Sequence, residues 1–384
     1  MFHGKSTHVR LLSALVVTLL LQGCAHSSSV APTASRIGAH GIRPDVKQTP
    51  PIGPTPPPNG NFMLEFPIPT SQARPRGIKH CGMNLCVAEF GASKIDILTT
   101  TGVFAEYSTP TANSGPFGVT EGADKNFWFT ESTANNIGRL TQSGVITEYP
   151  VPTAGSDPTA IWNGKKSTRL VWFTESAANK IASINVDTGS VVEYPLPTPN
   201  SDPDSIAQDF GGGQMWFIEH AANKVGVITP TGVITEIDIP TKQSGADDIT
   251  AVEDGNVWMT EPSIGKIARV DVRTHVITEF AVPYANSRPI GITEGDTFNH
   301  GYDGNGDPFT EQDDQVWFSD DGVNAVSGYN YRTGVFNIPI KIPTGRAGAG
   351  EISYAADNNI WYVEKNTNQV GVYHLPTPPP ASTH

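Results

Sequence analysis

The chain has 384 residues, of which 38% are hydrophobic and 9% aromatic, and its formal net charge is −13 at pH 7. This negative charge argues against nucleic acid or a bare anionic membrane surface as a partner, because both repel an acidic protein. Length alone suggests two domains. A repeat in the sequence overrides that expectation, because repeat architectures grow by adding units.

Residues 1–23 have the features of a secretory signal peptide of the lipoprotein type. The start is basic, and Leu11–Leu21 is an apolar run that is too short to span a bilayer as a helix. The segment ends in Leu-Gln-Gly-Cys, which resembles the bacterial lipobox and makes Cys24 the expected acylated first residue of the mature protein. The alternative is ordinary cleavage nearby, which leaves Cys24 as a free thiol.

We therefore expect an exported protein of the cell envelope that is bound to a lipid bilayer through acylated Cys24. Ala25 rather than an aspartate follows this cysteine, which favours an outer-membrane lipoprotein facing the periplasm or the surface. Residues 24–61 are rich in serine and then in proline, and we expect a tether, partly polyproline II, that reaches about 100 Å. Residues 377–384 are expected to form a disordered tail.

A repeated unit of four short strands fills the rest of the chain. Gly115–Thr153 shows it most clearly, with strand-like segments GPFGVTEG, NFWFTES, NNIGRLT and VITEYPVP separated by turn residues. A tryptophan in the second segment recurs at intervals of roughly 44 residues, with one longer interval of about 59. Cys86 stands one interval before the first of them. The tryptophans are Trp128, Trp172, Trp216, Trp258, Trp317 and Trp361.

Seven such units predict an all-β, seven-bladed β-propeller over residues 62–376, with four antiparallel strands per blade. The last unit has only three strands before a proline-rich end, whereas Phe62–Pro69 has the pattern of a fourth strand but precedes any first strand. We expect this N-terminal strand to complete the last blade and close the ring, because closure removes exposed sheet edges. The residues at the tryptophan position are expected to pack between blades.

Cys81 and Cys86 flank a tight turn in the first unit, in the sequence CGMNLC. An exported chain meets an oxidising compartment, and two cysteines on either side of such a turn can come within bridging distance. We predict a disulfide that staples the one unit without a tryptophan. The alternative is two reduced thiols in the core.

Propeller geometry brings two sets of residues to one end of the ring, where each first strand starts and each antiparallel second strand finishes. The opening residues, which follow the proline in patterns such as Pro-x-Gly-Ile, vary between units, as a ligand-facing surface would. They are Arg76, Phe117, Thr159, Asp204, Asp247, Ile290 and Gly350. The closing acids, which end the second strands, are Glu89, Glu131, Glu175, Glu219, Glu261, Asp320 and Glu364.

Two interpretations of the closing acids stay open. A residue that is repeated in every unit usually satisfies N–H groups of turns. The alternative is a cation site at the mouth of the channel, because hard divalent ions prefer carboxylates. His220, which follows Glu219 at the same end of the ring, is either a catalytic base or a histidine exposed on a turn.

The long interval marks an insertion, FNHGYDGNGDPFTEQDDQ, between the first two strands of the sixth unit. It lies at the opposite end of the ring from the opening residues. Its acidic residues resemble a calcium loop of the D-x-N-x-D type, although proline stands where such loops place glycine. The alternative is an acidic loop in solvent. The candidate Ca²⁺ ligands are Asp303, Asn305, Asp307, Glu311 and Asp314.

Units such as WFTESTANNIGRLTQSGVITEYPVPT and WFIEHAANKVGVITPTGVITEIDIPT resemble the virginiamycin B lyase family, over about residues 62–375. The resemblance implies a seven-bladed, magnesium-dependent lyase that opens a cyclic streptogramin depsipeptide by elimination at its ester. In that chemistry a base removes the proton α to a carbonyl, and the metal stabilises the enolate. The family carries histidines in its last two opening positions, in patterns like RPHAIT and EPHGI, and two metal-binding glutamates.

This chain departs from the family at those positions. Ile290 replaces the substrate-binding histidine, Gly350 replaces the catalytic histidine, and Gly348 replaces one metal-binding glutamate. Glu364 keeps its type and is the candidate Mg²⁺ ligand. Glu351 offers a carboxylate one residue beyond the missing catalytic histidine, although strand alternation should turn it to the other face.

Two classes of function follow. The first is a non-catalytic propeller that uses the opening residues to bind a small molecule, a glycan or a protein at the cell envelope. The second is a divergent metal-dependent lyase or hydrolase, with Glu351, Glu364 and His220 as candidate catalytic residues. The missing histidine pair favours the first. No motif for an organic cofactor is present, and we expect a monomer with Mg²⁺ or Ca²⁺ as the candidate ion.

Overall fold

The described residues of this computed structural model belong to the unit Ile42–His384 of the chain. The expected signal peptide, the acylated Cys24, the tether and the C-terminal tail lie outside them. Side chains are described for the same residues except 296–302 and 308–313. No helix in this described part is long and apolar enough to cross a membrane. The described backbone covers residues 63–211, 213–302 and 308–375.

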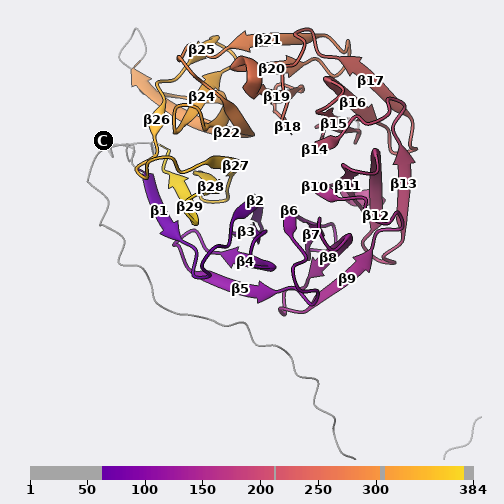
Figure 1. Cartoon of the computed structure of the whole chain (residues 1–384). Coiled ribbons are helices and arrows are strands. Elements are labelled where there is room, and N and C mark those ends of the chain that lie inside the picture. The colour runs from indigo at the N-terminus through magenta and orange to yellow at the C-terminus, as the bar shows by residue number, and fades with distance from the viewer. Residues whose placement is uncertain (1–62, 212, 303–307, 376–384) are drawn as a thin grey trace, which may run out of the picture. The chain divides into compact units, whose positions relative to one another are not determined.

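Seven antiparallel sheets are arranged in a ring, with the first strand of each blade innermost and the fourth strand outermost (Figure 1). Blades 1 to 3 contain β2 (Pro75–Cys81), β3 (Asn84–Glu89), β4 (Lys94–Leu98), β5 (Phe104–Ser108), β6 (Pro116–Glu121), β7 (Phe127–Glu131), β8 (Asn136–Leu140), β9 (Ile146–Pro150), β10 (Pro158–Asn163), β11 (Leu170–Glu175), β12 (Lys180–Asn185) and β13 (Val191–Pro195).

Blades 4 and 5 contain β14 (Pro203–Gln208), β15 (Met215–Glu219), β16 (Lys224–Ile228), β17 (Ile234–Asp238), β18 (Ile249–Ala251), β19 (Val257–Glu261), β20 (Lys266–Val270) and β21 (Ile277–Ala281). Blades 6 and 7 contain β22 (Pro289–Tyr302), β23 (Pro308–Asp320), β24 (Ala325–Asn330), β25 (Val335–Phe336), β26 (Ile340–Lys341), β27 (Ala349–Tyr354), β28 (Ile360–Glu364), β29 (Gln369–Tyr373) and β1 (Met63–Pro67). Two short 3₁₀ turns, Lys166–Thr168 and Pro262–Ile264, lie between strands. The expected all-β, seven-bladed propeller is confirmed.

The N-terminal strand closes the ring, as the sequence predicted. Strand β1 pairs antiparallel with β29, from Met63 opposite Tyr373 to Pro67 opposite Gln369. The ring of Phe66 is buried and stacks on Trp361 with centroids 5.7 Å apart. The last blade is therefore built from both ends of the propeller segment.

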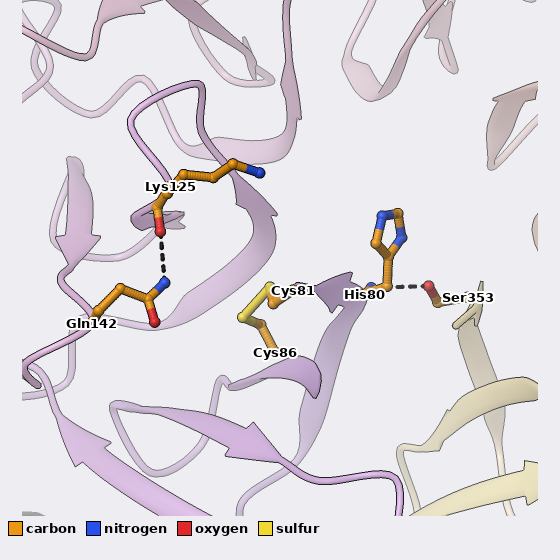
Figure 2. Close-up of a disulfide and its surroundings, with 6 residues drawn as sticks. All are labelled: His80, Cys81, Cys86, Lys125, Gln142 and Ser353. Atoms are coloured by element: carbon orange, nitrogen blue, oxygen red, sulfur yellow. Dashed lines mark hydrogen bonds between the residues drawn. A yellow bond between two sulfur atoms is a disulfide. The ribbon is translucent and has the colours of Figure 1, made fainter. Parts of the chain in front are cut away.

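The hydrophobic core is divided into seven clusters, one at each boundary between neighbouring blades. Trp128 of blade 2, for example, packs against Ile161 and Phe173 of blade 3. Cys86 takes the tryptophan position in blade 1, and a disulfide joins it to Cys81 (Figure 2). The residues at the tryptophan position thus pack between blades, as expected.

Blade 6 departs from the four-strand pattern. The inserted residues lengthen β22 and β23 into a long hairpin, whose described pairing runs from Pro289–Asp320 to Tyr302–Pro308. The outer strand is split, because β25 and β26 pair with opposite ends of β24. The insertion therefore extends the first-to-second strand turn, away from the end of the ring where the opening residues lie.

Candidate functional site

An asparagine before the third strand fixes the loop that leads into the next blade. Asn179 has a φ of 57°, a left-handed conformation that asparagine tolerates. Its side-chain nitrogen donates to two carbonyls of the loop, and its oxygen accepts from the backbone and hydroxyl of Ser201. Ser201 stands three residues before Asp204. Asn223 binds the loop ahead of Asp247 in the same way.

A β-bulge at the start of the first strands decides which side chains reach the channel. In six of the seven blades the pairing with the second strand shifts directly after the first paired residue. In blade 4, for example, the shift lies between Pro203 and Ser205. A bulge can turn two consecutive side chains to one side. Asp204 and Ser205 accordingly both line the cavity at this end of the channel.

This cavity has a volume of about 170 Å³, and its wall includes five of the seven opening residues. Two opening residues are not in its wall. The hydroxyl of Thr159 lies within hydrogen-bond distance of the Thr174 and Ser176 hydroxyls. The carbonyl of Gly350 accepts from the Ser319 hydroxyl. The opening residues that do line the cavity are Arg76, Phe117, Asp204, Asp247 and Ile290.

The charges of the opening residues are segregated around the cavity wall. Arg76 comes from blade 1, and Lys365 directly follows the second strand of the adjacent blade 7. Asp204 and Asp247 come from blades 4 and 5, on the far side of the ring (Figure 1). The cavity therefore has a basic side at blades 7 and 1 and an acidic side at blades 4 and 5.

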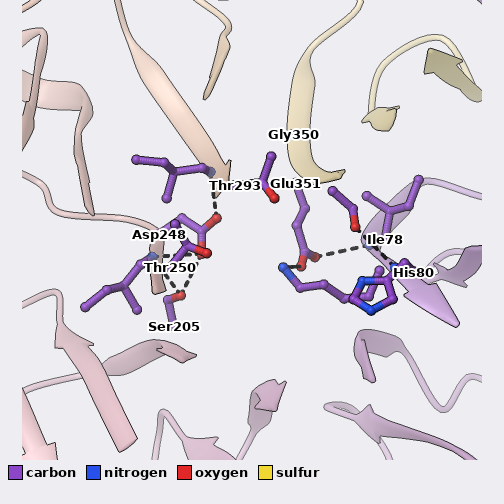
Figure 3. A network of polar contacts seen from close by, with 12 residues as sticks. Ile78, His80, Ser205, Asp248, Thr250, Thr293, Gly350 and Glu351 are labelled. Atoms are coloured by element: carbon purple, nitrogen blue, oxygen red, sulfur yellow. Dashed lines mark hydrogen bonds and ion pairs between the residues drawn. The ribbon is translucent and has the colours of Figure 1, made fainter. Parts of the chain in front are cut away.

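Two further carboxylates of the wall join neighbouring inner strands (Figure 3). The Oδ1 atom of Asp248 accepts from the Ser205 hydroxyl at 2.7 Å, and its Oδ2 atom accepts from the Ile292 N–H at 2.8 Å. Asp248 thus connects blade 5 to blades 4 and 6. The Oε1 atom of Glu351 lies 3.0 Å from Lys79 Nζ and connects blade 7 to blade 1.

The expectation that strand alternation turns Glu351 away from the cavity is wrong. The pairing of β27 with β28 shifts between Ala349 and Ile352, and this bulge brings Glu351 into the wall. Burial raises the pKa of Glu351 to about 7, and the charge of Lys79 opposes that shift. Because its carboxylate is already paired with Lys79, Glu351 serves as a contact between blades.

Four charged or aromatic residues of the wall were not expected from the sequence. Asp248 and Lys365 directly follow an opening residue and a closing acid, so their positions next to these residues were the available signals. Lys79 and Trp162 stand further along the first strands, with Lys79 Nζ 4.6 Å from the centroid of the Trp162 ring. These two also line a second cavity of about 410 Å³ at the other end of the inner strands. They therefore lie between the two cavities.

His220 lies beside the acidic side of the cavity. Its Nδ1 atom is 2.8 Å from the carbonyl of Ala246 and 3.4 Å from Oδ2 of Asp204. Burial raises the pKa of Asp204 well above its ordinary value, and the charge of Asp247 adds to this shift. Burial also raises the pKa of Asp247 to about 6. The structure thus brings together two opening residues and the histidine that the sequence singled out.

The closing acids lie inside the blades rather than in the cavity wall. All seven are fully buried. Glu131 is typical: burial, followed by the charge of Glu148 on the fourth strand, raises its pKa to about 7. The polar side chains of Ser114 and Asn136 nearby oppose that shift. The closing acids are thus part of the interior of each blade.

The residues at the family's magnesium position do not fit the ion. Glu364 is fully buried, and its Oε2 atom accepts from the Thr367 hydroxyl at 2.5 Å. Burial raises the pKa of Glu364 to about 7. Gly348 supplies no carboxylate and has a φ of 69°. A Cβ at Gly348 would lie 2.4 Å from the Asn366 side chain, so a glutamate there requires a rearrangement.

The proposed calcium loop is only partly described. Glu311 lies in β23, and its side chain is not described. Asp314 is buried and forms an ion pair with Arg332. The candidate ligands outside the described residues are Asp303, Asn305 and Asp307.

The fold and the cavity define a class of protein, a seven-bladed β-propeller with a charged cavity between its inner strands at one end. The model of the virginiamycin B lyase family matches residues 58–299, and the chain belongs to this family. The matched range ends before Gly348, Gly350 and Glu364, the positions at which the sequence resemblance implies the family's catalytic histidine and metal ligands.

Solved structures agree with this assignment. A streptogramin B lyase is 28% identical, with a TM-score of 0.73 and coverage of 82% of this chain and 98% of its own. Virginiamycin B lyase from Staphylococcus aureus is 30% identical, with a TM-score of 0.72 and coverage of 83% and 100%. A catalytically inactive variant of that enzyme, solved with quinupristin, has a TM-score of 0.73 at the same identity. No curated protein matches the chain.

Proposed function

We propose that this member of the virginiamycin B lyase family is an exported, lipid-anchored binding protein that has lost the streptogramin lyase reaction. The observation that carries the proposal is the segregation of charge around the cavity, together with Ile290 and Gly350 at the two positions where the family resemblance implies histidines. Neither side chain can accept a proton from carbon at neutral pH. The cavity itself remains open and lined with groups that bind charged ligands.

The basic side of the cavity suits a small molecule with a carboxylate or another anionic group. The guanidinium of Arg76 lies 5.6 Å from the ring centroids of both Phe90 and Phe117, so two aromatic contacts hold it in place. A held guanidinium can bind a carboxylate through two parallel hydrogen bonds. Lys365 lies on the same side. The cavity is smaller than the roughly 300–1,000 Å³ of drug-sized ligand sites, so it admits a single small group.

The test is a thermal-shift screen of the mature protein against amino acids, short peptides, uronic acids and sugar phosphates, followed by calorimetry of the hits. We expect an anionic hit whose affinity falls about tenfold or more in Arg76→Ala, because a charge-assisted pair contributes about 1.5–3 kcal/mol. Arg273→Ala, at an exposed arginine outside the wall, is the matched control. Equal binding by Arg76→Ala and the unchanged protein would contradict the proposal.

A metal-dependent lyase or hydrolase is the second candidate function. It is favoured by one observation, the convergence of Asp204, His220 and Asp247 beside the cavity. The same screen decides between the two candidates if each hit is incubated with the protein and a divalent cation and then analysed by mass spectrometry. An unchanged mass supports binding alone, whereas a new product that requires the cation supports catalysis.

The lipid anchor is tested separately, by metabolic labelling with radioactive palmitate in a bacterial host. We expect the label to enter the unchanged protein and the protein to sediment with membranes. Cys24→Ser should lose both properties. Labelling that persists in Cys24→Ser would show that the anchor is elsewhere or absent.

A further inference from the structure

We propose that Asp204, His220 and Asp247 form a binding site for a first-row divalent cation of the Zn²⁺ or Mn²⁺ type. One possible ligand atom from each of the three residues lies within 4.8 Å of the other two. Asp204 is the second residue of β14, His220 directly follows β15, and Asp247 precedes β18. The site thus spans the boundary between blades 4 and 5. This proposal goes beyond the proposed function and does not depend on it.

An unpartnered buried atom points to a ligand at this place. The Oδ1 atom of Asp204 is buried and has no hydrogen-bond partner among the described residues. The side chain as a whole is 26% exposed, so its other edge opens to solvent. Burying a carboxylate oxygen without a hydrogen-bond partner costs free energy, because the oxygen loses its hydration and gains no interaction that replaces it. A cation held between Asp204 and Asp247 would remove this cost.

The setting of His220 is that of a metal-binding imidazole. Its Nδ1 atom lies 2.8 Å from the Ala246 carbonyl, and a hydrogen bond there leaves the lone pair on Nε2. Ligand histidines commonly donate their second ring nitrogen to a backbone carbonyl, which fixes the tautomer. The side chain is 41% exposed, so the ring can adjust to an incoming ion.

The donor set favours a transition metal over magnesium or calcium. Imidazole nitrogen suits Zn²⁺ and its neighbours, whereas Mg²⁺ and Ca²⁺ prefer oxygen ligands alone. Three protein ligands also match in number the zinc sites that keep a further position for water or a bound molecule. The site is separate from Glu364 and Gly348, the positions at which the family resemblance implied magnesium.

The test is calorimetric titration of the chelator-stripped mature protein with Zn²⁺, Mn²⁺, Mg²⁺ and Ca²⁺. We expect Zn²⁺ to bind most tightly and Mn²⁺ next. Asp204→Asn, His220→Gln and Asp247→Asn should each weaken Zn²⁺ binding about tenfold or more. Metal-free melting temperatures identify any variant that fails to fold, and the three substitutions provide independent readings of one site.

Three controls separate this site from others on the chain. His275→Gln removes another partly exposed histidine, Glu364→Gln alters the family's metal position, and the double variant Asp303→Asn with Asp307→Asn alters the inserted loop. All three should leave Zn²⁺ affinity unchanged. In Mn²⁺-loaded protein, pulsed electron paramagnetic resonance should show an imidazole nitrogen coupling that His220→Gln removes.

Three results would contradict the proposed cation site. Failure of the unchanged protein to bind Zn²⁺ or Mn²⁺ would refute the site. So would Zn²⁺ affinity that survives both Asp204→Asn and His220→Gln, or that is lost only in the double loop variant. Loss of anion binding in Arg76→Ala is measured without metal and does not bear on this result, so the site and the proposed function can fail independently.

Discussion

Asp96 occupies a position that is glycine, alanine or serine in every other blade. Its partner on the second strand is Val87, whereas the equivalent pair in blade 2 is Gly138 and Phe129. A Cβ at Gly138 would lie 2.1 Å from the Phe129 ring, so the aromatic ring fills that space. The smaller Val87 leaves room for a carboxyl group. Asp96 is therefore fully buried within a cluster of three acidic side chains.

Asp96→Asn should weaken the dependence of stability on pH. Burial, followed by the charge of Glu89, raises the pKa of Asp96 well above its ordinary value. The folded state keeps the proton after the unfolded chain has lost it, so this contribution to stability is lost as pH rises. Asparagine has nearly the same shape as aspartate but does not titrate. We expect the substitution to change the free energy of unfolding more favourably at pH 8 than at pH 5, by at least about 1 kcal/mol relative to the unchanged protein.

Urea denaturation at the two pH values measures this effect, because the midpoint reports stability when the slope is unchanged. Asp238→Asn, at a side chain that is 84% exposed, is the matched control and should keep the pH dependence of the unchanged protein. An identical pH dependence in Asp96→Asn and the unchanged protein would show that Asp96 does not titrate between folded and unfolded states.

At the scale of the strand, a glutamate on the fourth strand clamps each blade to the one before it. Glu193 on β13 accepts from the backbone N–H and the hydroxyl of Thr153, which follows the fourth strand of the preceding blade. Lys180 of the same blade donates to both side chains. Blade 6, whose outer strand is split, is the exception. The glutamates that make the equivalent contact are Glu65, Glu106, Glu148, Glu236 and Glu279.

Glu193→Ala should lower the free energy of unfolding by about 1–3 kcal/mol, because it leaves the Lys180 ammonium and the Thr153 N–H without their acceptor. Urea denaturation provides the measurement. Asp238→Ala on the neighbouring fourth strand removes an exposed ion pair and should have a much smaller effect on the free energy of unfolding. Equal effects of the two substitutions would mean that the clamp contributes no more than an ordinary surface pair.

The buried glutamates at the ends of the second strands give the whole set of blades a common pH dependence. A carboxyl group with a raised pKa stabilises the fold below about pH 4.5, and this stabilisation is lost as pH rises through its folded value. The second strands contribute six such groups, each with its pKa raised by burial to about 7. They are Glu89, Glu131, Glu175, Glu219, Glu261 and Glu364.

Melting temperature should therefore fall as pH rises from 5 to 8. Below pH 4.5 a second group acts in the opposite direction. Burial alone would raise the pKa of Glu193, but hydrogen bonds from Lys180 and Thr153 lower it, so its stabilisation is lost in acid. We expect a maximum of stability near pH 5. Scanning calorimetry in a buffer series measures this, and a melting temperature that rises steadily from pH 5 to 8 would contradict it.

The strand pattern could be predicted from the sequence, whereas only some of the residues that line the cavity could be predicted. Period-2 alternation and the recurring tryptophan gave the blades and the closing strand. Alternation then failed at Glu351, because a bulge at the start of its first strand interrupts it. Asp248 lies in the wall directly before its first strand, where strand alternation gives no prediction. The clustering of Asp247 with Asp204 and His220 depends on how blades 4 and 5 meet, which no local pattern encodes.

At the scale of the propeller, one short strand joins the first and last blades. Besides its pairing with β29, the strand β1 places Glu65 where it accepts from the backbone and hydroxyl of Thr344 in blade 6. Phe66 and Ile68 belong to the core between blades 7 and 1. The stability of the whole ring thus depends on a few residues at the start of the propeller.

Deletion of residues 62–70 should open the ring and expose the edge of β29, so that the protein aggregates. Size-exclusion chromatography measures this, with deletion of residues 25–61 as the control that keeps β1. Phe66→Ala weakens the packing of β1 without removing the strand and should lower the free energy of unfolding by about 3–5 kcal/mol. A monomeric deletion variant with an unchanged melting temperature would show that β1 is dispensable.

The central claim is that the chain keeps the propeller and cavity of the virginiamycin B lyase family without its reaction. The most direct test is the mass spectrum of quinupristin after incubation with the mature protein and Mg²⁺, with an active streptogramin lyase as positive control. We predict that quinupristin stays cyclic, because Ile290 and Gly350 supply no base and the residues around Glu364 do not fit the metal. A linear elimination product that requires this protein would contradict the account.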